Sequence, residues 1–383
     1  MQGKGESQSI NSFAAYFLKL GAGGFGGPIA LIGAMHRDLV EERHWVDEAD
    51  YRNGLALAQL APGPLAAQLA IYLGWLKGRA VGAAFIGLAF ILPSFLIVLA
   101  FSALYVRFGG IPWMQGAFYG VGAAVIAIIV RSAFKLSKKT LEKDVVLWGI
   151  FLVNAVATAV LGTEFVWLVL ASGLLCMAVK TMGKSRPLAM VLLPPWLITG
   201  LHGPASSFEL GKIFAFFAQA GAFVFGSGLA IVPFLHGGVV VERHWLTEQQ
   251  FLDAVAVAML TPGPVVITVA FIGYLVGGPI GACLAALGTF LPCYLFTVLP
   301  APHFAKWVKN QFVGAFIRGV TAAATGAIAG AVIVLARHAL TDVLTAVIFG
   351  VSTLVLWRTS KVPEPALVLI AAVIGIVSKE LLK

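Results

Sequence analysis

An internal repeat constrains the fold of this chain more than any other feature of the sequence. When the sequence is shifted by 200 residues, residues 17–64 align with residues 217–264 without a gap, and 19 of these 48 pairs are identical. After one deletion the offset becomes 199, and Leu92-Pro93 meets Leu291-Pro292. The chain therefore consists of two homologous halves, and what the first half builds the second builds again.

The predicted units are residues 13–183 for the N-terminal repeat and residues 213–383 for the C-terminal repeat. A linker over residues 184–212 joins them, and its apolar stretch Pro187–Leu201 is a candidate for one further membrane crossing. If the linker crosses, the two halves have opposite orientations in the membrane. If it does not, they are parallel.

The composition excludes a soluble globular domain. The chain is 60% hydrophobic and 11% charged, whereas a soluble domain carries about 25% charged residues. Apolar stretches of the roughly 20 residues that a membrane helix needs recur throughout, as at Phe13–Met35, Ala80–Val106 and Gly314–Ala336. We expect an all-α polytopic protein that has the lipid bilayer as a partner. The polar Met1–Ser12 gives no expectation of a cleavable signal peptide.

The loop charges indicate inverted halves. The net charge of +9 does not indicate nucleic acid, because the basic residues lie in short loops, where they orient a membrane protein. In the first half they occupy one set of alternate loops, at Lys77, Arg79, Arg131, Lys135, Lys138, Lys139, Lys143, Lys180, Lys184 and Arg186. In the second half they occupy the other set, at Lys306, Lys309, Arg358 and Lys361. Lys379 and Lys383 favour the parallel alternative.

Two glycine- and proline-rich motifs break the apolar helices of each half. Glycine lets the backbone approach a ligand, and proline suits the first position of a new helix. A helix that restarts at Pro28 or Pro64 would direct free N–H groups into the break and form an anion site. Breaks from two halves could then surround a tetrahedral oxyanion near the membrane midplane. The alternative is that these residues only permit close packing and kinks.

The candidate substrate-binding residues are these breaks and the two glutamines beside the first proline motif. They are Gly26, Gly27, Pro28, Gln59, Pro62, Gly63, Pro64, Gln68, Gly226, Ser227, Gly228, Pro262, Gly263 and Pro264. Met259 and Thr268 stand where the first half has Gln59 and Gln68, and a serine at 227 replaces an expected glycine. We therefore expect the second-half site to be the weaker one.

The Glu-Arg-His-Trp tetrad gives the candidate gating or coupling residues. They are Glu42, Arg43, His44, Glu242, Arg243 and His244. An arginine attracts an oxyanion, a glutamate neutralises it, and a histidine titrates near neutral pH. The alternative is an interfacial anchor, with Trp45 and Trp245 at the level of the lipid headgroups.

Few ionisable residues fall inside apolar segments. Lys19, Arg318 and Asp253 are the expected membrane-buried charges, and such residues are functional candidates because burying them is costly. The sequence contains no metal-ligand cluster, no phosphate-binding loop and no nucleophile–base arrangement. We expect neither an enzyme nor a cofactor, and the three cysteines are expected to pack rather than react.

The ordered motifs resemble the chromate ion transporter (CHR) family over essentially the whole chain. The resemblance is carried by Gly26-Gly27-Pro28, Trp45, Gln59–Pro64, Gln68, Gly74 and Phe90–Ser94. It identifies the chain as a long-chain, two-half member. The positions that match the family motifs are Gly26, Gly27, Pro28, Trp45, Pro62, Gly63, Pro64 and Pro93, with Gly226, Trp245, Pro262, Gly263, Pro264 and Pro292 in the second half.

The resemblance implies a function. It implies a secondary transporter in the bacterial inner membrane that expels chromate, driven by the membrane potential or a proton gradient, and so confers chromate resistance. Sulfate has the same charge and shape as chromate and remains an alternative substrate. A passive anion channel, a membrane enzyme and a non-transporting scaffold are alternative functions, and a homodimer is an open alternative for the assembly.

Overall fold

The computed structural model describes residues 9–25, 27–108, 112–142, 144–161, 166–181, 207–223, 228, 231–304, 311–359 and 362–381. The regular structure of these residues is helical throughout. Three of the candidate residues, Gly26, Gly226 and Ser227, lie outside the described residues. So does the predicted linker up to residue 206.

The order of helices repeats from one half to the other. The first half contains α1 (Ile10–Gly23), α2 (Gly27–His36), the π-helical turn η1 (Arg37–Glu42), α3 (Glu48–Leu60), α4 (Leu65–Phe108), α5 (Pro112–Leu141), α6 (Val145–Leu161) and α7 (Val166–Thr181). The second half contains α8 (Ser207–Phe223), α9 (Ile231–His236), η4 (Gly237–Glu242), α10 (Glu248–Leu260), η5 (Val265–Ile267), α11 (Thr268–Val298), η6 (Ala301–His303), α13 (Gln311–Ala339), α14 (Val343–Arg358) and α15 (Glu364–Leu381).

The first predicted membrane segment is not one continuous helix but turns back on itself. α1 has 14 residues, about 21 Å of helix, against about 30 Å of bilayer hydrocarbon. After the glycines the chain returns, because the Tyr16 hydroxyl donates to Asp38 at 3.2 Å and the Phe13 and Trp45 rings lie 6.1 Å apart. The break is therefore the tip of a re-entrant helical hairpin.

A second re-entrant hairpin follows the first. α3 leads to the Pro-Gly-Pro motif, and the chain returns along the start of α4 until Lys77 donates to the Trp45 carbonyl at 3.0 Å. At Gly78 and Arg79 the backbone leaves the helical conformation, and the chain reverses again. The second half has the same turn at Gly277 and Gly278.

Glycine makes this turn in α4 compact. A Cβ on Gly74 would lie 2.6 Å from the carbonyl oxygen of Gly82, and one on Gly87 would lie 2.9 Å from Ile71. Since these pairs are 8 and 16 residues apart, the two segments of α4 lie antiparallel and in direct contact. Small residues permit that approach.

Among the described residues, four helices are long and apolar enough to cross a membrane by length and composition. They are Leu65–Phe108, Gln115–Lys138, Val265–Val298 and Gly314–Ala339. They form two repeat-related pairs, α4 with α11 and α5 with α13. Shorter apolar helices include Val145–Leu161, Val343–Arg358 and Glu364–Ser378.

The halves exchange their long helices. α5 packs against α14 and α15 of the second half, whereas α13 packs against α6 and α7 of the first. A glycine permits close approach in both contacts. Gly120 of α5 lies against Ala371 and Gly375 of α15, and Gly319 of α13 lies against Ser172 and Cys176 of α7. The two halves therefore form one interlocked body rather than two adjacent domains.

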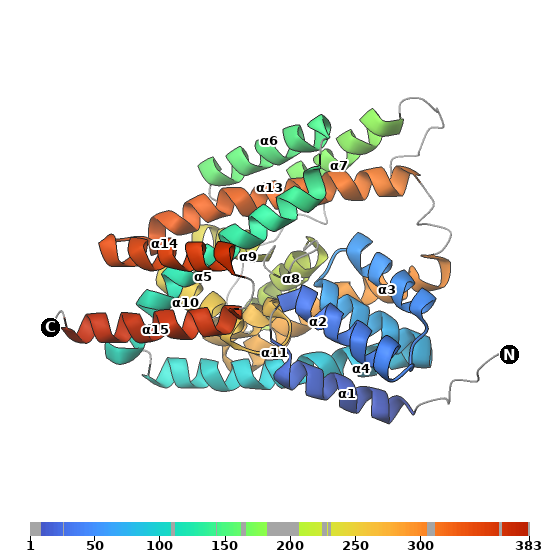
Figure 1. Ribbon diagram of the computed structural model, residues 1–383, viewed down its shortest axis with the longest axis horizontal. Helices are drawn as coiled ribbons and strands as arrows, with labels where there is room; N and C mark the ends of the chain where they lie inside the picture. Colours follow the sequence, from blue (N-terminus) through green and yellow to red (C-terminus); the bar gives the residue numbers. More distant parts are fainter. Residues whose placement is uncertain are drawn as a thin grey trace.

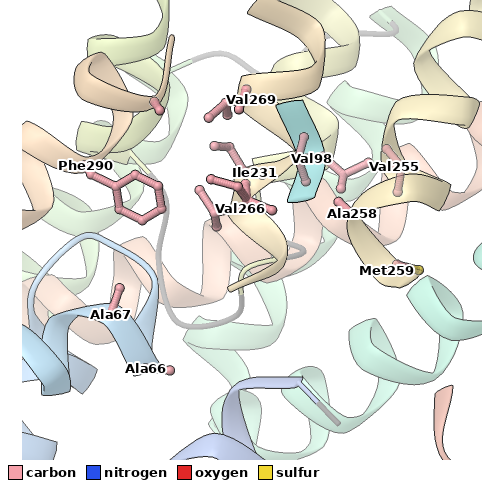
Figure 2. Close-up of a cluster of buried hydrophobic side chains, with 14 of the residues drawn as sticks. Ala66, Ala67, Val98, Ile231, Val255, Ala258, Met259, Val266, Val269 and Phe290 are labelled. Carbon is pink, nitrogen blue, oxygen red and sulfur yellow. The ribbon is translucent and has the colours of Figure 1, made fainter. Parts of the chain in front are cut away.

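Repeat-related helices run in opposite directions in the view of Figure 1. The chain leaves α4 and enters α5 at the left of the picture, but it leaves α11 and enters α13 at the right. Figure 2 shows the core between the halves, where Val98 of α4 lies beside Val255 and Ala258 of α10. Val98 is fully buried there, and Val255 is almost so.

Candidate functional site

The tip of the first hairpin, residues 23–28, requires glycine for two reasons. Gly24 donates its N–H to the Leu20 carbonyl at 2.7 Å, and a Cβ on Gly24 would collide with that oxygen and with Leu31. Gly27 opens α2 with φ +75°, which L side chains rarely adopt. The helix thus restarts one residue before Pro28, which occupies the first turn, where its missing N–H costs little.

The second tip in each half is the proline break, Pro62–Pro64 and Pro262–Pro264. Gly63 has φ +141° and Gly263 has φ +96°, so both turns depend on glycine. In α4 the Gln68 N–H donates to the Pro64 carbonyl at 2.9 Å. The N–H groups of the residues before Gln68, in the first turn of α4, have no carbonyl of the same helix to bond, as at every helix start. They are donors suited to an anion.

The proline break of the second half is bonded to the glycine tip of the first. The Gly263 N–H donates to the Gly24 carbonyl at 2.8 Å. Gly263 also lies against Ser94 of α4, so that a Cβ there would collide with the Ser94 hydroxyl. The repeat-related contact exists as well, since a Cβ on Gly63 would lie 3.0 Å from the sulfur of Cys293 on α11. The tips of both halves therefore converge in the interior.

Ser94 and Cys293 occupy equivalent positions in the two repeats and contact equivalent backbone carbonyls. The Ser94 hydroxyl donates to the Gly21 carbonyl at 3.2 Å, and the Cys293 thiol faces the Gly221 carbonyl at 3.9 Å. Both side chains are fully buried. Sequence reasoning missed both as site residues. The signal was available in the Leu-Pro-Ser and Leu-Pro-Cys segments, which align across the repeat.

Gln68 supports the first proline break. Its side-chain amide donates to the Pro62 carbonyl at 2.6 Å, and the whole residue is buried. Its Oε1 atom has no hydrogen-bond partner in the described part of the chain. In the second half, Thr268 donates to Val265 in its own turn at 2.8 Å and to no other residue that the structure describes. The polar difference between the halves that the sequence indicates is present in the packing.

The other described candidate residues differ in exposure. Gly27 and Pro28 are half-buried, and Gly228 is buried against Val266. Gln59 is exposed on α3, whereas its mate Met259 is buried. Residues of α5, Lys138 among them, line two cavities of about 350 and 430 Å³, and no tip residue belongs to either lining.

The charge beside the glycine tip is negative. Lys19 and Arg318, the cations expected within apolar membrane segments, lie exposed on the outer faces of their helices. The charged group beside Gly27 is a carboxylate: Glu364 lies 3.9 Å from the position of a Cβ on Gly27. Arg131 and Lys135 of α5 face that carboxylate.

The Glu-Arg-His-Trp tetrads close the first hairpin in the same way in both halves. The guanidinium of Arg43 lies 4.8 Å from the Trp45 ring, and that of Arg243 lies 4.4 Å from the Phe216 ring. His44 and His244 have positive φ and bond the carbonyls of Val40 and Val240. These contacts are all made within the first hairpin of each half, and the coupling role and the anchor role of the tetrads both stay predictions. Glu42 and Glu242 are exposed.

A second pair of histidines carries ion pairs that the sequence did not predict. His36 bonds Glu48 at 2.8 Å, and His236 bonds Glu248 at 2.7 Å. His338 of α13 approaches Glu248 at 3.5 Å. These pairs tie the end of each first hairpin to the start of the second hairpin.

Two interlocked repeats, converging re-entrant tips and apolar helix bundles define a multi-pass membrane protein of the broken-helix transporter class. A family model described as chromate transporter matches residues 12–177 and again residues 211–376. The chain belongs to the chromate transporter family.

The similar proteins carry the same description. The chain is 57% identical to the chromate transport protein of Cupriavidus metallidurans, over 98% of this chain and 94% of that protein. It is 56% identical to the probable chromate transport protein of Synechococcus elongatus, over 96% and 95% of the two chains. It is 35% identical to the chromate transport protein of Pseudomonas aeruginosa, over 84% and 80%. Among solved structures, none matches the chain.

Proposed function

We propose that this protein is a secondary transporter that exports chromate across the bacterial inner membrane and so confers chromate resistance. The observation that carries the proposal is the hydrogen bond from Gly263 to Gly24, which joins broken helices of opposite halves. The bond brings helix starts of the two halves close together, which supports an ion site of the kind that broken-helix transporters use.

We propose that the anion binds at these tips through backbone donors. A dianion in the bilayer core needs several kcal/mol of compensation, and Lys19 and Arg318, the cations expected within the membrane, point outward from their helices. The binding residues would be Gly26, Gly27, Pro28, Gln59, Pro62, Gly63, Pro64 and Gln68, with Gly226, Ser227, Gly228, Pro262, Gly263 and Pro264 from the second half.

We propose that the halves, over residues 13–183 and 213–383, are inverted in the membrane and move by alternating access. The opposite directions of α4 and α11 in Figure 1 support inversion. The burial of Gly63 and Gly263 at the proline breaks supports a gated site over an open pore. Sulfate transport and a passive channel are the alternatives that the experiment must separate.

The test is chromate uptake into inverted vesicles, with and without an imposed gradient. Export from the cell predicts gradient-driven uptake, competition by sulfate weaker than self-competition by chromate, and acceleration by chromate preloaded inside. Preloading accelerates a transporter but slows net flux through a channel. Vesicles with the protein that match empty controls would overturn the proposal, and stronger competition by sulfate would reassign the substrate.

A further inference from the structure

The two proline-break hairpins are packed differently although their sequences are repeats. α10 is buried from Phe251 through Met259 and contacts α4, α5 and α15. α3 packs mainly on α4 and exposes Arg52, Asn53 and Gln59. One hairpin is closed onto the helix bundles and the other is open. Inverted repeats that exchange these two conformations would open the second half as the first is open now.

One carboxyl group would pass from a buried to an exposed position in that exchange. Asp253 of α10 is 3% exposed, and its repeat mate Asn53 is exposed on α3. The Tyr105 hydroxyl of α4 donates to Oδ2 of Asp253 at 2.7 Å, and the Gln249 amide donates to Oδ1 at 2.8 Å. The carboxyl thus joins a helix of the first half to the closed hairpin of the second.

The surroundings of Asp253 are apolar. The Tyr105 ring packs edge-on against Phe118 at 5.5 Å and Phe271 at 5.2 Å. Val255 and Ala258, on the same helix, are buried against α4 (Figure 2). Gln249, one helical turn towards the start of α10, is exposed, so water lies only one turn from the carboxyl.

No cation compensates this carboxyl among the residues that the structure describes. On α4, Lys77 bonds the Trp45 carbonyl, and Arg79 and Arg107 stack on Trp75 and Phe108. α11 contains no Asp, Glu, Lys, Arg or His. On α5 and α15, Arg131 and Lys135 face Glu364. The titratable partner in contact with Asp253 is Tyr105.

A carboxylate held only by neutral donors is costly to bury, and a proton removes that cost. Its hydrogen bonds survive protonation, because the tyrosine hydroxyl can donate or accept. We propose that Asp253 is the proton-binding site of this transporter and gains and releases one proton per transport cycle. Water reaches the carboxyl when its hairpin opens, and the proton is carried when the hairpin closes. The inference rests on the proposed function.

The test uses the purified full chain in proteoliposomes with a trapped pH indicator and the membrane potential clamped at zero. The wild type should show a chromate-dependent pH change inside the vesicles and a chromate flux that responds to an imposed pH gradient. Asp253→Asn should lose both responses while chromate still moves down its own gradient. Asn53→Ser, at the exposed mate, should behave as the wild type does.

Tyr105→Phe is the second variant. It removes one donor to the carboxylate and should keep the proton response but move its half-maximal pH upward, because a carboxylate with fewer donors binds a proton more readily. If Asp253→Asn does not fold, an unmoved pH response in folded Tyr105→Phe overturns the inference.

Failure of the proposed function and failure of the proton site give different results. If the wild type moves no chromate, the proposed function falls. If the wild type moves chromate and the proton response of Asp253→Asn is unchanged, only the proton site falls.

Discussion

The backbone N–H of Gly263 donates to the carbonyl oxygen of Gly24 at 2.8 Å, and the two residues belong to opposite halves of the chain. Gly263 cannot carry a side chain there, since its φ is +96° and a Cβ would collide with Ser94. The bond therefore fixes the closest approach of the two sets of tips. Any movement that separates the hairpins must break it or move both residues together.

Gly263→Ala should lower stability through both backbone strain and the collision with Ser94. A strained backbone residue costs about 1–3 kcal/mol. Ser94→Ala in the same chain should recover part of the loss, because the nearest atom is the Ser94 hydroxyl, while the strain remains. The wild type, the two single variants and the double variant are compared by their thermal midpoints in detergent and by their chromate flux.

The matched control for that series is Gly149→Ala on α6, where a Cβ would meet no atom within 4 Å. It should be neutral or stabilising by about 1 kcal/mol, as alanine is in a helix interior. Strictly additive effects of Gly263→Ala and Ser94→Ala would show that the two residues do not interact.

Gln68→Leu should impair chromate transport more than it impairs folding. The variant removes the donor to the part-buried Pro62 carbonyl, 2.6 Å away, and a carbonyl left unpaired in full burial costs about 1–3 kcal/mol, which is the upper bound here. Thr268→Val is the control in the second half, since Thr268 bonds only its own turn. Flux and thermal midpoints of both variants test this, and equal flux in the two would remove the special role of Gln68.

Cysteines at positions 138 and 337 should report opposite sides of the membrane. Lys138 and Arg337 are exposed and lie near the ends of the repeat-related helices α5 and α13. Cys176, Cys283 and Cys293 must first be replaced, Cys283 above all because it is exposed. Labelling of whole cells and of inverted vesicles with an impermeant thiol reagent is the measurement. Labelling of both positions from one side would establish parallel halves.

Acid should weaken the ion pair between the hairpins of the second half. Burial raises the pKa of Glu248, but the hydrogen bond from His236 and the charges of His236 and His338 outweigh it, so that the pKa lies below its usual value. Such a carboxylate stabilises the fold above its unfolded pKa of about 4.3, and this stabilisation is lost as the pH falls through the folded pKa. The thermal midpoint should therefore drop at acidic pH.

Glu248→Gln should remove this component of the acid dependence. The pKa of Glu48, the repeat mate, is also lowered, by its hydrogen bonds with His36 and Arg52, but Glu48 lies at the surface, where solvent screens the pair. Glu48→Gln should change the profile less. Melting curves from pH 7 to pH 3 measure the difference, and a Glu248→Gln profile identical to that of the wild type would contradict it.

The elements that the sequence predicted well are those with local causes. The breaks at Gly23–Pro28 and Pro62–Pro64 are where expected, because glycine and proline act on their own backbone dihedrals. The outward orientation of Lys19 and Arg318 could not be predicted, because an apolar segment does not say which face of its helix meets other helices. Ser94 and Cys293 were missed, because their importance comes from residues of the other half.

The sequence by itself determined the membrane class, the family and the division into two halves, because hydrophobicity and repetition are properties of the chain alone. Only the tertiary structure decided that the tips of opposite halves touch, that α5 and α13 exchange partners, and that Asp253 is buried while Asn53 is exposed. Two halves with the same pattern can pack in two ways. The choice between them depends on contacts between residues some two hundred positions apart, which no local pattern contains.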